Sequence, residues 1–333
     1  AVEYARRLAQ RGVPVYALVR AYRLGQQFLL RQAFDTSSEI GDGEDVRAEA
    51  YDRIVHQVFD YIDWISQRVV VVYEDERETW LAHQSSARED AVRQLLGGGD
   101  VDVASAERAL GYRLSSVHHL AVVAWTSGPG APGDHPAGSV RAIREFAAEI
   151  GGGAPLVVGC DQATSWAWVP VPRDWRFDEE LAGWRSVGRP GTVLAVGSSR
   201  EGVEGFCRSH AEASRVHRLV ALGGVPDRSV VSHDEPGVAA TSLLAQDLPG
   251  TRAWVRGVLG DLIQEGESTA RLRSTLLTLL RHDMSYTATA EAMVMHKNSI
   301  RYRLTSAEAM LGHRVTENRL DVELALTACT WLG

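Results

Sequence analysis

A heptad repeat near the N-terminus constrains the fold of this chain more than any other feature of its sequence. Seven apolar side chains follow one another in alternating steps of four and three residues, the spacing that places them in one stripe along an α-helix. They are Tyr51, Val55, Val58, Ile62, Ile65, Val69 and Val72. The repeat stops at Glu76, but residues 74–93 contain no glycine or proline, so the helix can continue as a solvated connector. The pattern predicts one long helix whose stripe must pack against another helix.

The sequence leaves open which helix covers this stripe. β-branched residues at heptad positions suit a coiled coil between two copies of the chain, and they suit equally the core of a helical bundle within one copy. Helices for a bundle precede the repeat, since Gly12 can end one helix and Pro14 suits the first turn of the next. A polar loop over residues 35–45 separates that helix from the repeat. We therefore predict a helical N-terminal domain over residues 1–96.

The pattern changes after a glycine-rich boundary at residues 97–100. Short apolar runs of strand length then alternate with amphipathic helical segments, which is typical of an α+β domain. The predicted strands are 120–125, 156–159, 166–169, 192–196 and a short one near Val230, and the predicted helices are 140–150 and 203–220. We expect helices on one side of a sheet and a loop over the proline- and glycine-rich residues 126–138. The domain is placed at 101–235, followed by a helical connector at 236–268.

Length, hydropathy and cysteine content exclude several classes of protein. A chain of 333 residues exceeds the usual size of one hydrophobic core. Its apolar runs are far shorter than the roughly 18 residues of a membrane span, and we see no secretory leader. Cys160, Cys207 and Cys329 are too widely spaced for a disulfide framework or a thiolate metal site. We expect a cytoplasmic multidomain protein with no membrane partner.

Charge is distributed unevenly along the chain. The net charge of −8 would make nucleic acid an improbable partner if it were spread evenly. Residues 271–333, however, carry eight basic and six acidic side chains, and residues 292–307 carry three basic side chains and no acidic one. This asymmetry indicates that any contact with nucleic acid lies near the C-terminus.

The C-terminal segment, residues 269–333, has the pattern of an all-α helix-turn-helix domain. A leucine stripe marks a first helix that ends near His282. Ser285 is a natural N-cap for a short second helix over residues 286–293, and a third helix runs from about His296 to Leu311 and stops at Gly312. Two short helices followed by a basic third element are typical of this motif.

A helical wheel divides the third helix into two faces. Its buried stripe is predicted to consist of Ile300, Leu304, Ala307 and Leu311, and Asn298, Tyr302 and Thr305 are predicted to lie on the opposite side. Ser299 and Arg301 flank that side, and Lys297 and Arg303 lie nearer the boundary between the two faces. In this docking mode the first turns of the third helix reach base edges, where Asn can pair with adenine and Arg with guanine, while Lys, Ser and Tyr hold phosphates. The alternative is a solvated basic face. The residues predicted to contact DNA are Ser285, Tyr286, Thr287, His296, Lys297, Asn298, Ser299, Arg301, Tyr302 and Arg303.

Residues 296–304, followed by Glu308, Leu311 and Gly312, closely resemble the signature of the PucR/CdaR family of bacterial transcriptional regulators. The resemblance continues in residues 285–290 and in residues 319–326. It departs from the family at Val294, where the turn usually carries a glycine. Upstream, residues 191–213 resemble a degenerate GGDEF-like domain, and the helical first segment resembles the N-terminal domain of RsbR-type co-antagonists.

The resemblance implies a three-part regulator. Its fold would combine a helical bundle, a ferredoxin-like or GGDEF-like α+β domain and the helix-turn-helix domain. The N-terminal domain would sense a signal or mediate dimerisation. The implied partners are double-stranded promoter DNA, a second copy in a homodimer or higher homo-oligomer, and a small-molecule effector.

A nucleotide-binding or cyclic-dinucleotide signalling protein with a degenerate GGDEF-like domain is the alternative. Cyclisation needs a hairpin with glycines and a pair of acids, but the candidate turn at residues 159–164 has Asp161 alone. Adjacent His118 and His119 would point to opposite faces of a strand, which disfavours joint metal binding. His210 and His217, and the tryptophans of the middle domain, are more typical of packing than of a ligand site; these tryptophans are Trp166, Trp168, Trp175 and Trp184. We expect no enzymatic activity and no catalytic, cofactor or metal residues.

Overall fold

The computed structural model describes residues 1–39, 44–99, 101–126, 135–161, 163–185, 191–223 and 229–332. The chain divides into two compact units, residues 1–90 and residues 91–333. Among the described residues, no helix is both long enough and apolar enough to cross a membrane.

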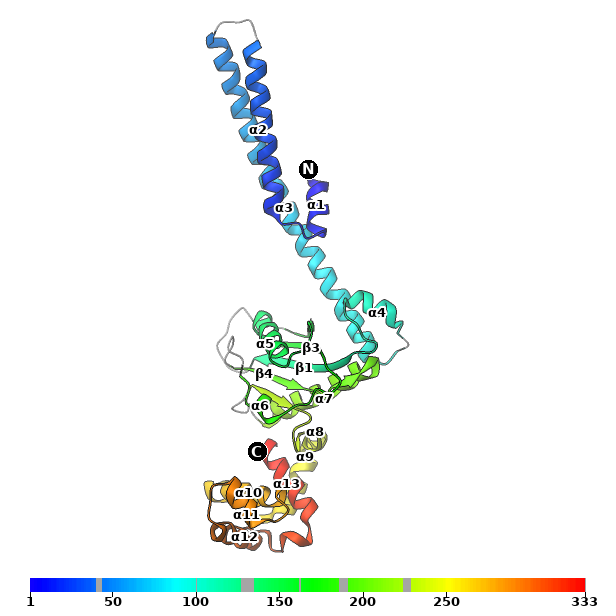
Figure 1. Cartoon of the computed structure of the whole chain (residues 1–333), viewed down its shortest axis with the longest axis vertical. Coiled ribbons are helices and arrows are strands. Elements are labelled where there is room, and N and C mark those ends of the chain that lie inside the picture. The colour runs from blue at the N-terminus through cyan, green and yellow to red at the C-terminus, as the bar shows by residue number, and fades with distance from the viewer. Residues whose placement is uncertain are drawn as a thin grey trace. The chain divides into compact units, whose positions relative to one another are not determined.

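The first unit is a helical hairpin with a short helix packed against it (Figure 1). Its elements are α1 (Val2–Gln10), α2 (Val15–Glu39) and α3 (Glu44–Leu96), and the last residues of α3 belong to the second unit. Helix α3 runs for 53 residues, so the predicted continuation beyond Glu76 is confirmed. The predicted polar loop over residues 35–45 is wrong for residues 35–39 and 44–45, which are helical because polar residues without glycine or proline can continue a helix, and residues 40–43 lie outside the described residues.

Half of the heptad stripe is covered within the chain. Ile62, Ile65 and Val69 are buried in one cluster with Leu18 of α2 and with two alanines of α1, Ala5 and Ala9. The hydroxyl of Tyr73 adds a 2.6 Å hydrogen bond to the carbonyl oxygen of Val13. Tyr51 and Val55, near the hairpin tip, are only partly buried. The bundle-core interpretation therefore holds for the second half of the stripe.

The middle of the chain forms α4 (Val103–Leu110) and a six-stranded sheet of order β2-β3-β1-β4-β6, with β5 paired to one end of β1. The pairs are antiparallel except β4–β6, which is parallel. The strands are β1 (His118–Thr126), β2 (Leu156–Gly159), β3 (Thr164–Val171), β4 (Thr192–Val196), β5 (Arg200–Glu201) and β6 (Val230–Ser232). The helices are α5 (His135–Glu149), α6 (Glu179–Ala182) and α7 (Gly202–Gly223).

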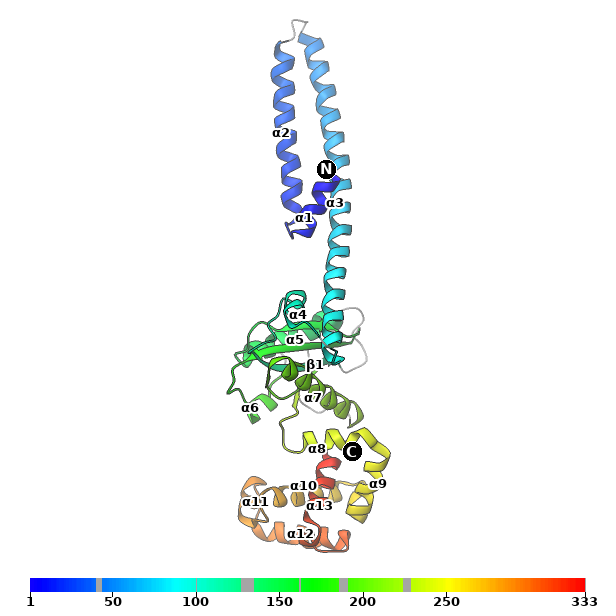
Figure 2. The ribbon, with the colours of Figure 1, turned by 90° about the vertical axis from the view of Figure 1, so that its right-hand side faces the viewer.

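Helices cover both faces of this sheet, so the expectation of helices on one side is wrong. Leu120 and Val122 of β1 share a core with Ile143 of α5, whereas Val123 of the same strand shares a core with Phe206 of α7. Figures 1 and 2 show α5 and α7 on opposite sides of the strands. The physical reason is that β1 is apolar at nearly every position, and such a strand needs cover on both sides.

The predicted strand and helix positions are otherwise confirmed, with ends shifted by a few residues. The exception is the predicted loop over residues 126–138, because α5 already begins at His135. Residues 127–134 of that loop lie outside the described residues.

The C-terminal part is entirely helical. The connector contains α8 (Val238–Leu244), η1 (Ala245–Asp247), α9 (Leu248–Leu259) and η2 (Gly260–Ile263). It is followed by α10 (Glu267–Arg281), α11 (Tyr286–Ala292), α12 (Lys297–Leu311), η3 (Val315–Glu317) and α13 (Arg319–Leu332). Leu259 and Leu262 of the connector pack in one core with Leu276, Ile300 and Val322. This core holds α12 in place against α10 and η2.

Candidate nucleic-acid interface

A side chain caps the N-terminus of each of the helices α11 and α12. The Ser285 hydroxyl accepts a hydrogen bond from the N–H of Ala288 at 3.3 Å, as its sequence position predicted. At the start of α12, the Nδ1 atom of His296 accepts from the N–H of Asn298 at 3.2 Å. The Ser285 oxygen and the His296 Nδ1 atom thus position the helix starts. Whether these side chains also contact DNA stays a prediction.

Helix α12 has one buried and one exposed face. Its buried residues are Ile300, Leu304, Ala307 and Leu311, which confirms the predicted stripe. On the other side Tyr302 is 74% exposed, and Lys297, Asn298 and Arg301 are exposed as well. Ser299 is half-buried. The structure therefore brings the polar residues of the first turns together on an open surface, where the positive end of the helix dipole adds to the side-chain charge.

Helix α12 has no acidic side chain over most of its length. The first acid of the helix is Glu308, in the last turn. Its carboxylate accepts a 3.1 Å hydrogen bond from the N–H of Val315, beyond the end of the helix. The first turns of α12 thus carry basic side chains and no acidic one, which suits an anionic partner.

Arg301 and Tyr286 link α11 to α12. The guanidinium carbon of Arg301 lies 5.8 Å from the centre of the Tyr286 ring, within the range of a cation–π interaction. Tyr286 is half-buried, while Ser285 and Thr287 beside it are exposed. The contact restricts Arg301 on the surface and limits the entropy that it would lose on binding a base.

Arg303 points partly into the domain. Its Nη1 donates a 2.9 Å hydrogen bond to the hydroxyl of Thr275, which is buried on α10. The helical wheel placed Arg303 near the boundary between the buried and exposed faces of α12. In the structure its long side chain reaches toward the buried face and contacts α10. A contact between Arg303 and DNA stays a prediction, but this arginine already fixes α12 on α10.

Arg319 is a structural residue that sequence reasoning missed. Its Nη2 donates to the carbonyl oxygen of Leu280 at 3.1 Å and to the Asp283 carboxylate at 2.9 Å. The two bonds tie the start of α13 to the end of α10. Residues 36 and 39 positions apart carry no local pattern that could reveal this pairing.

Val294, in the turn between α11 and α12, adopts a backbone conformation that favours glycine. Its φ is +52°, in the left-handed region, and its side chain is 93% exposed. A β-branched side chain is strained there, because the Cβ substituents crowd the backbone. The turn therefore keeps the left-handed geometry that a glycine would supply, although the sequence departs from the family pattern.

We expect Val294→Gly to raise the free energy of unfolding by about 1 kcal/mol, since relief of left-handed strain outweighs the added flexibility of glycine in the unfolded chain. Val294→Ala, which keeps the Cβ atom, should gain less. Urea unfolding of the full-length variants followed by circular dichroism measures both. An equal or lower stability of the glycine variant would show that the turn is not strained.

The GGDEF-like hairpin turn between β2 and β3 is closed by its own aspartate. The Asp161 carboxylate accepts from the N–H groups of Ala163 and Thr164 at 2.7 and 2.8 Å. Burial raises the pKa of Asp161, but these bonds outweigh it and hold the pKa below its ordinary value. Gln162 lies outside the described residues. The carboxylate therefore acts as a turn cap.

Histidines of the middle domain serve packing. His119 is fully buried, where Nδ1 lies 2.9 Å from the Tyr112 hydroxyl and Nε2 lies 3.0 Å from the carbonyl oxygen of Leu114. His210 packs against Trp166 and Trp168, and burial lowers its pKa to about 4, so it is neutral at pH 7. Within the described ranges, no three His, Cys, Asp or Glu side chains are grouped as metal ligands.

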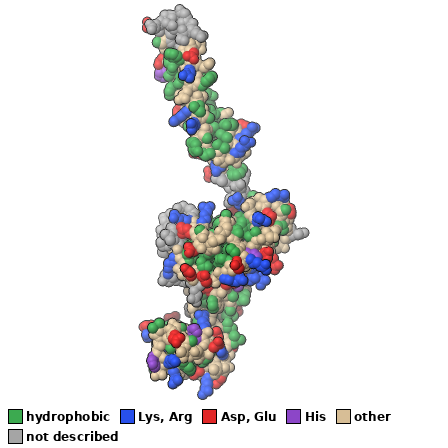
Figure 3. All heavy atoms as spheres, viewed as in Figure 1, with side chains coloured by type: hydrophobic (Ala, Val, Ile, Leu, Met, Phe, Trp, Pro, Cys, Tyr) green, Lys and Arg blue, Asp and Glu red, His purple; other side chains and the backbone are tan. Residues whose placement is uncertain are grey.

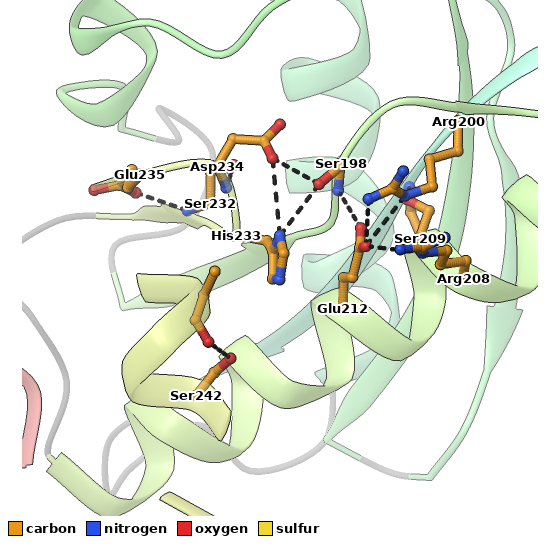
Figure 4. A network of polar contacts seen from close by, with 12 residues as sticks. Ser198, Arg200, Arg208, Ser209, Glu212, Ser232, His233, Asp234, Glu235 and Ser242 are labelled. Carbon is orange, nitrogen blue, oxygen red and sulfur yellow. Dashed lines mark hydrogen bonds and ion pairs between the residues drawn. The ribbon is translucent and has the colours of Figure 1, made fainter. Parts of the chain in front are cut away.

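A buried polar network joins three parts of the middle domain (Figure 4). Glu212 of α7 is 2% exposed, and its carboxylate accepts from the guanidinium of Arg200 at 2.7 Å and from the N–H of Ser198 at 3.0 Å. The Ser198 hydroxyl donates to the Asp234 carboxylate at 2.6 Å and lies 3.2 Å from Nδ1 of His233. Sequence reasoning missed this network because its members lie 12 to 36 residues apart.

Three models of known protein families match successive parts of the chain. Residues 1–88 match the RsbT co-antagonist protein rsbRD N-terminal domain, residues 96–219 match the GGDEF-like domain, and residues 272–328 match the PucR C-terminal helix-turn-helix domain. These matches define a multidomain protein with a helix-turn-helix domain at its C-terminal end. The chain therefore combines an RsbRD-type N-terminal domain, a GGDEF-like domain and a PucR-type C-terminal helix-turn-helix domain.

Two individual proteins match short segments of the chain. The chain is 38% identical over 86 residues to the uncharacterized protein YsfB of Bacillus subtilis (strain 168), which is 25% of this chain and 22% of the relative. It is 36% identical over 78 residues, 23% of this chain and 43% of the relative, to an uncharacterized protein in the pkwA 5′ region of Thermomonospora curvata. The chain thus spans less than half the length of either relative.

Among solved structures, a regulator of polyketide synthase expression from Bifidobacterium adolescentis is 21% identical, with a TM-score of 0.35. The match covers 74% of this chain and 98% of that one.

Proposed function

We propose that this chain is a sequence-specific DNA-binding transcriptional regulator in which α12 enters the major groove of promoter DNA. The observation that carries the proposal is the exposed face of α12, where Lys297, Asn298 and Arg301 lie opposite a buried apolar stripe with no acidic group among them. The upstream domains would respond to a signal, and no catalytic step is part of this function.

The three side chains are proposed to divide the work of binding. Lys297 is a flexible point charge at the first position of α12 and suits a phosphate. Asn298 and Arg301 have planar groups that can form two hydrogen bonds with one base, adenine for the amide and guanine for the guanidinium. A phosphate contact contributes to binding of every sequence, whereas a base contact contributes only to the correct one.

The test uses full-length protein and the DNA upstream of its own gene, located by footprinting. We expect Lys297→Ala to weaken binding to operator and random DNA alike and to lower the salt slope by about one. Asn298→Ala and Arg301→Ala should weaken operator binding by about 1 to 3 kcal/mol each and leave random DNA nearly unaffected. Fluorescence anisotropy at several salt concentrations measures both quantities.

Arg271→Ala is the matched control, because this exposed arginine of α10 pairs with Glu267 and is not part of the proposed interface. It should change neither the salt slope nor the specificity. If all three α12 variants bind the operator as the unchanged protein does, α12 is not the recognition helix.

We further propose that the protein is a dimer joined through its N-terminal hairpin. The support is a second apolar stripe on α3, in which Tyr61, Trp64 and Val71 are 55%, 57% and 64% exposed. Arg68 lies in the same stripe, 5.9 Å from the centre of the Trp64 ring. Figure 3 shows hydrophobic side chains on the surface of this hairpin.

The small core of the hairpin supports the same proposal. Among the described residues of the first unit only seven apolar side chains are buried, fewer than a stable domain of this length usually has. Two hairpins packed by their second stripes would form a four-helix bundle and remove these aromatic rings from water. A dimer also supplies two recognition helices for two half-sites.

A further inference from the structure

A cavity of 410 Å³ lies between the connector and the helix-turn-helix domain. Its walls come from α9, the end of η2 and the two residues after it, α10 and α13, and every lining residue is described. This volume is within the range of small-molecule sites. No side chain of the proposed DNA-contacting face lines it, so the cavity has no part in the function proposed above.

One wall of the cavity is apolar. Val255 of α9 and Ala328 and Leu332 of α13 are all at most 6% exposed, and Ile263 closes one side. None of these side chains can hydrogen-bond. An occupant must therefore present an apolar body to this wall.

Arginines surround the apolar wall. Arg252 and Arg256 lie one turn apart on α9, Arg273 comes from α10, and the single acid of the lining is Glu265. Arg273 is held in place, because its Nη1 donates to the carbonyl oxygens of Leu262 at 2.8 Å and Gln264 at 3.1 Å. Three guanidinium groups against one carboxylate favour an anionic group in the occupant.

A second hollow adjoins the first. It measures 350 Å³ and shares Arg273 and Cys329 with the larger cavity, and it adds Arg281 to the arginines of this surface. Cys329 is half-buried, so its thiol reports on occupancy of both hollows. An elongated molecule could follow the surface from one hollow into the other.

We propose that this cavity binds an amphipathic organic anion, with an apolar chain against α13 and a carboxylate, sulfonate or phosphate group among Arg252, Arg256 and Arg273. The cavity is formed jointly by the connector helix α9 and by helices of the DNA-binding domain. An occupant therefore changes how α9 packs against α10 and α13. This site goes beyond the proposed function and does not depend on DNA binding.

Decanoate serves as the probe, and decyltrimethylammonium, with the same chain and the opposite charge, is its control. Calorimetric titration of the full-length protein without DNA should show one saturable site for decanoate and at least tenfold weaker binding of the cation. The double variant Arg252→Ala and Arg256→Ala should bind decanoate at least tenfold more weakly, since two charged hydrogen-bond donors are lost. Both arginines are exposed, so the fold should be unaffected.

Arg271→Ala is again the matched control, because it removes one nearby positive charge that does not line the cavity. A second readout is the rate at which a thiol reagent modifies Cys329 in a full-length Cys160→Ser and Cys207→Ser variant. Decanoate should slow this rate at the concentrations that saturate calorimetry. The proposal is wrong if decanoate does not bind, if both probes bind equally, if the double variant binds normally, or if Cys329 is not protected.

Discussion

A full-length variant carrying Tyr61→Glu and Trp64→Glu is expected to be monomeric and to bind an operator with two half-sites about 10² to 10⁴ times more weakly. Charged side chains at these positions would have to be buried without partners in the four-helix bundle of a dimer. In one copy both positions are more than half exposed, so the hairpin itself should keep its fold. The loss in affinity comes from the lost second contact with DNA.

Sedimentation measures the mass of the variant, and fluorescence anisotropy compares the complete operator with a single half-site. Affinity for the single half-site should not change, because the helix-turn-helix domain is intact. Phe59→Glu is the matched control: it adds one negative charge at an equally exposed aromatic residue on the opposite side of α3. A monomeric unchanged protein, or a double variant that is still dimeric, would contradict the proposed interface.

Local patterns in the sequence were sufficient to predict the elements that carry the proposed function. The buried stripe of α12 follows from side-chain spacing alone, and the Ser285 cap follows from one residue type before a helix. Strand β4 was predicted with its correct ends, because Thr192 and the four apolar residues after it stand between two glycines. These features depend on residues close together in the chain.

Features that depend on distant residues could not be predicted in this way. The heptad stripe requires a covering helix, but the periodicity does not say that α1 and α2 supply it for Ile62, Ile65 and Val69. The wheel places Arg303 at a boundary, and only the position of Thr275 on α10 decides that the side chain turns inward. The packing of helices on both faces of β1 could have been predicted from the sequence, because the apolar residues of this strand do not alternate with polar ones.

Glu212→Ala is expected to lower the free energy of unfolding by about 1 to 3 kcal/mol, the usual cost of leaving a buried hydrogen-bond donor without its acceptor. Glu212 is 2% exposed, and its carboxylate accepts hydrogen bonds from the guanidinium of Arg200 and from the backbone N–H of Ser198. The guanidinium of Arg208 forms an ion pair with the same carboxylate at 3.7 Å. Without the carboxylate, the buried N–H of Ser198 loses its acceptor, whereas the guanidinium groups of Arg200 and Arg208, whose side chains are 34% and 60% exposed, can bind water instead. The β4–β5 loop then loses its attachment to α7.

Glu204→Ala is the matched control for this loss, because Glu204 is an exposed carboxylate on the same helix. Its effect should be at most about 1 kcal/mol, because the carboxylate lies in the first turn of α7 and its exposed interaction with the helix dipole is weak. Urea unfolding followed by circular dichroism measures both variants. Equal stabilities of the two would show that the network of Glu212 contributes little to the fold.

The pH dependence of stability gives an independent test of the same carboxylate. Burial raises the pKa of Glu212, but the hydrogen bonds from Arg200 and Ser198 outweigh it, and the folded-state pKa lies below the ordinary value of 4.5. A lowered pKa means that the unfolded chain binds the proton more readily. The stabilisation by Glu212 is therefore complete above pH 4.5 and is lost as the pH falls through the folded-state value.

Glu212→Gln isolates this contribution, because the amide keeps the size of the side chain and cannot ionise. We expect the unchanged protein to lose stability more steeply than Glu212→Gln as the pH is lowered from 5 to 3, a range chosen to bracket the ordinary pKa of 4.5. At pH 7 the glutamine variant should be less stable, and the difference should shrink with acidity as the glutamate becomes neutral. Parallel stability curves for the two proteins over this range would show that the Glu212 carboxylate is not held in its charged form by Arg200 and Ser198.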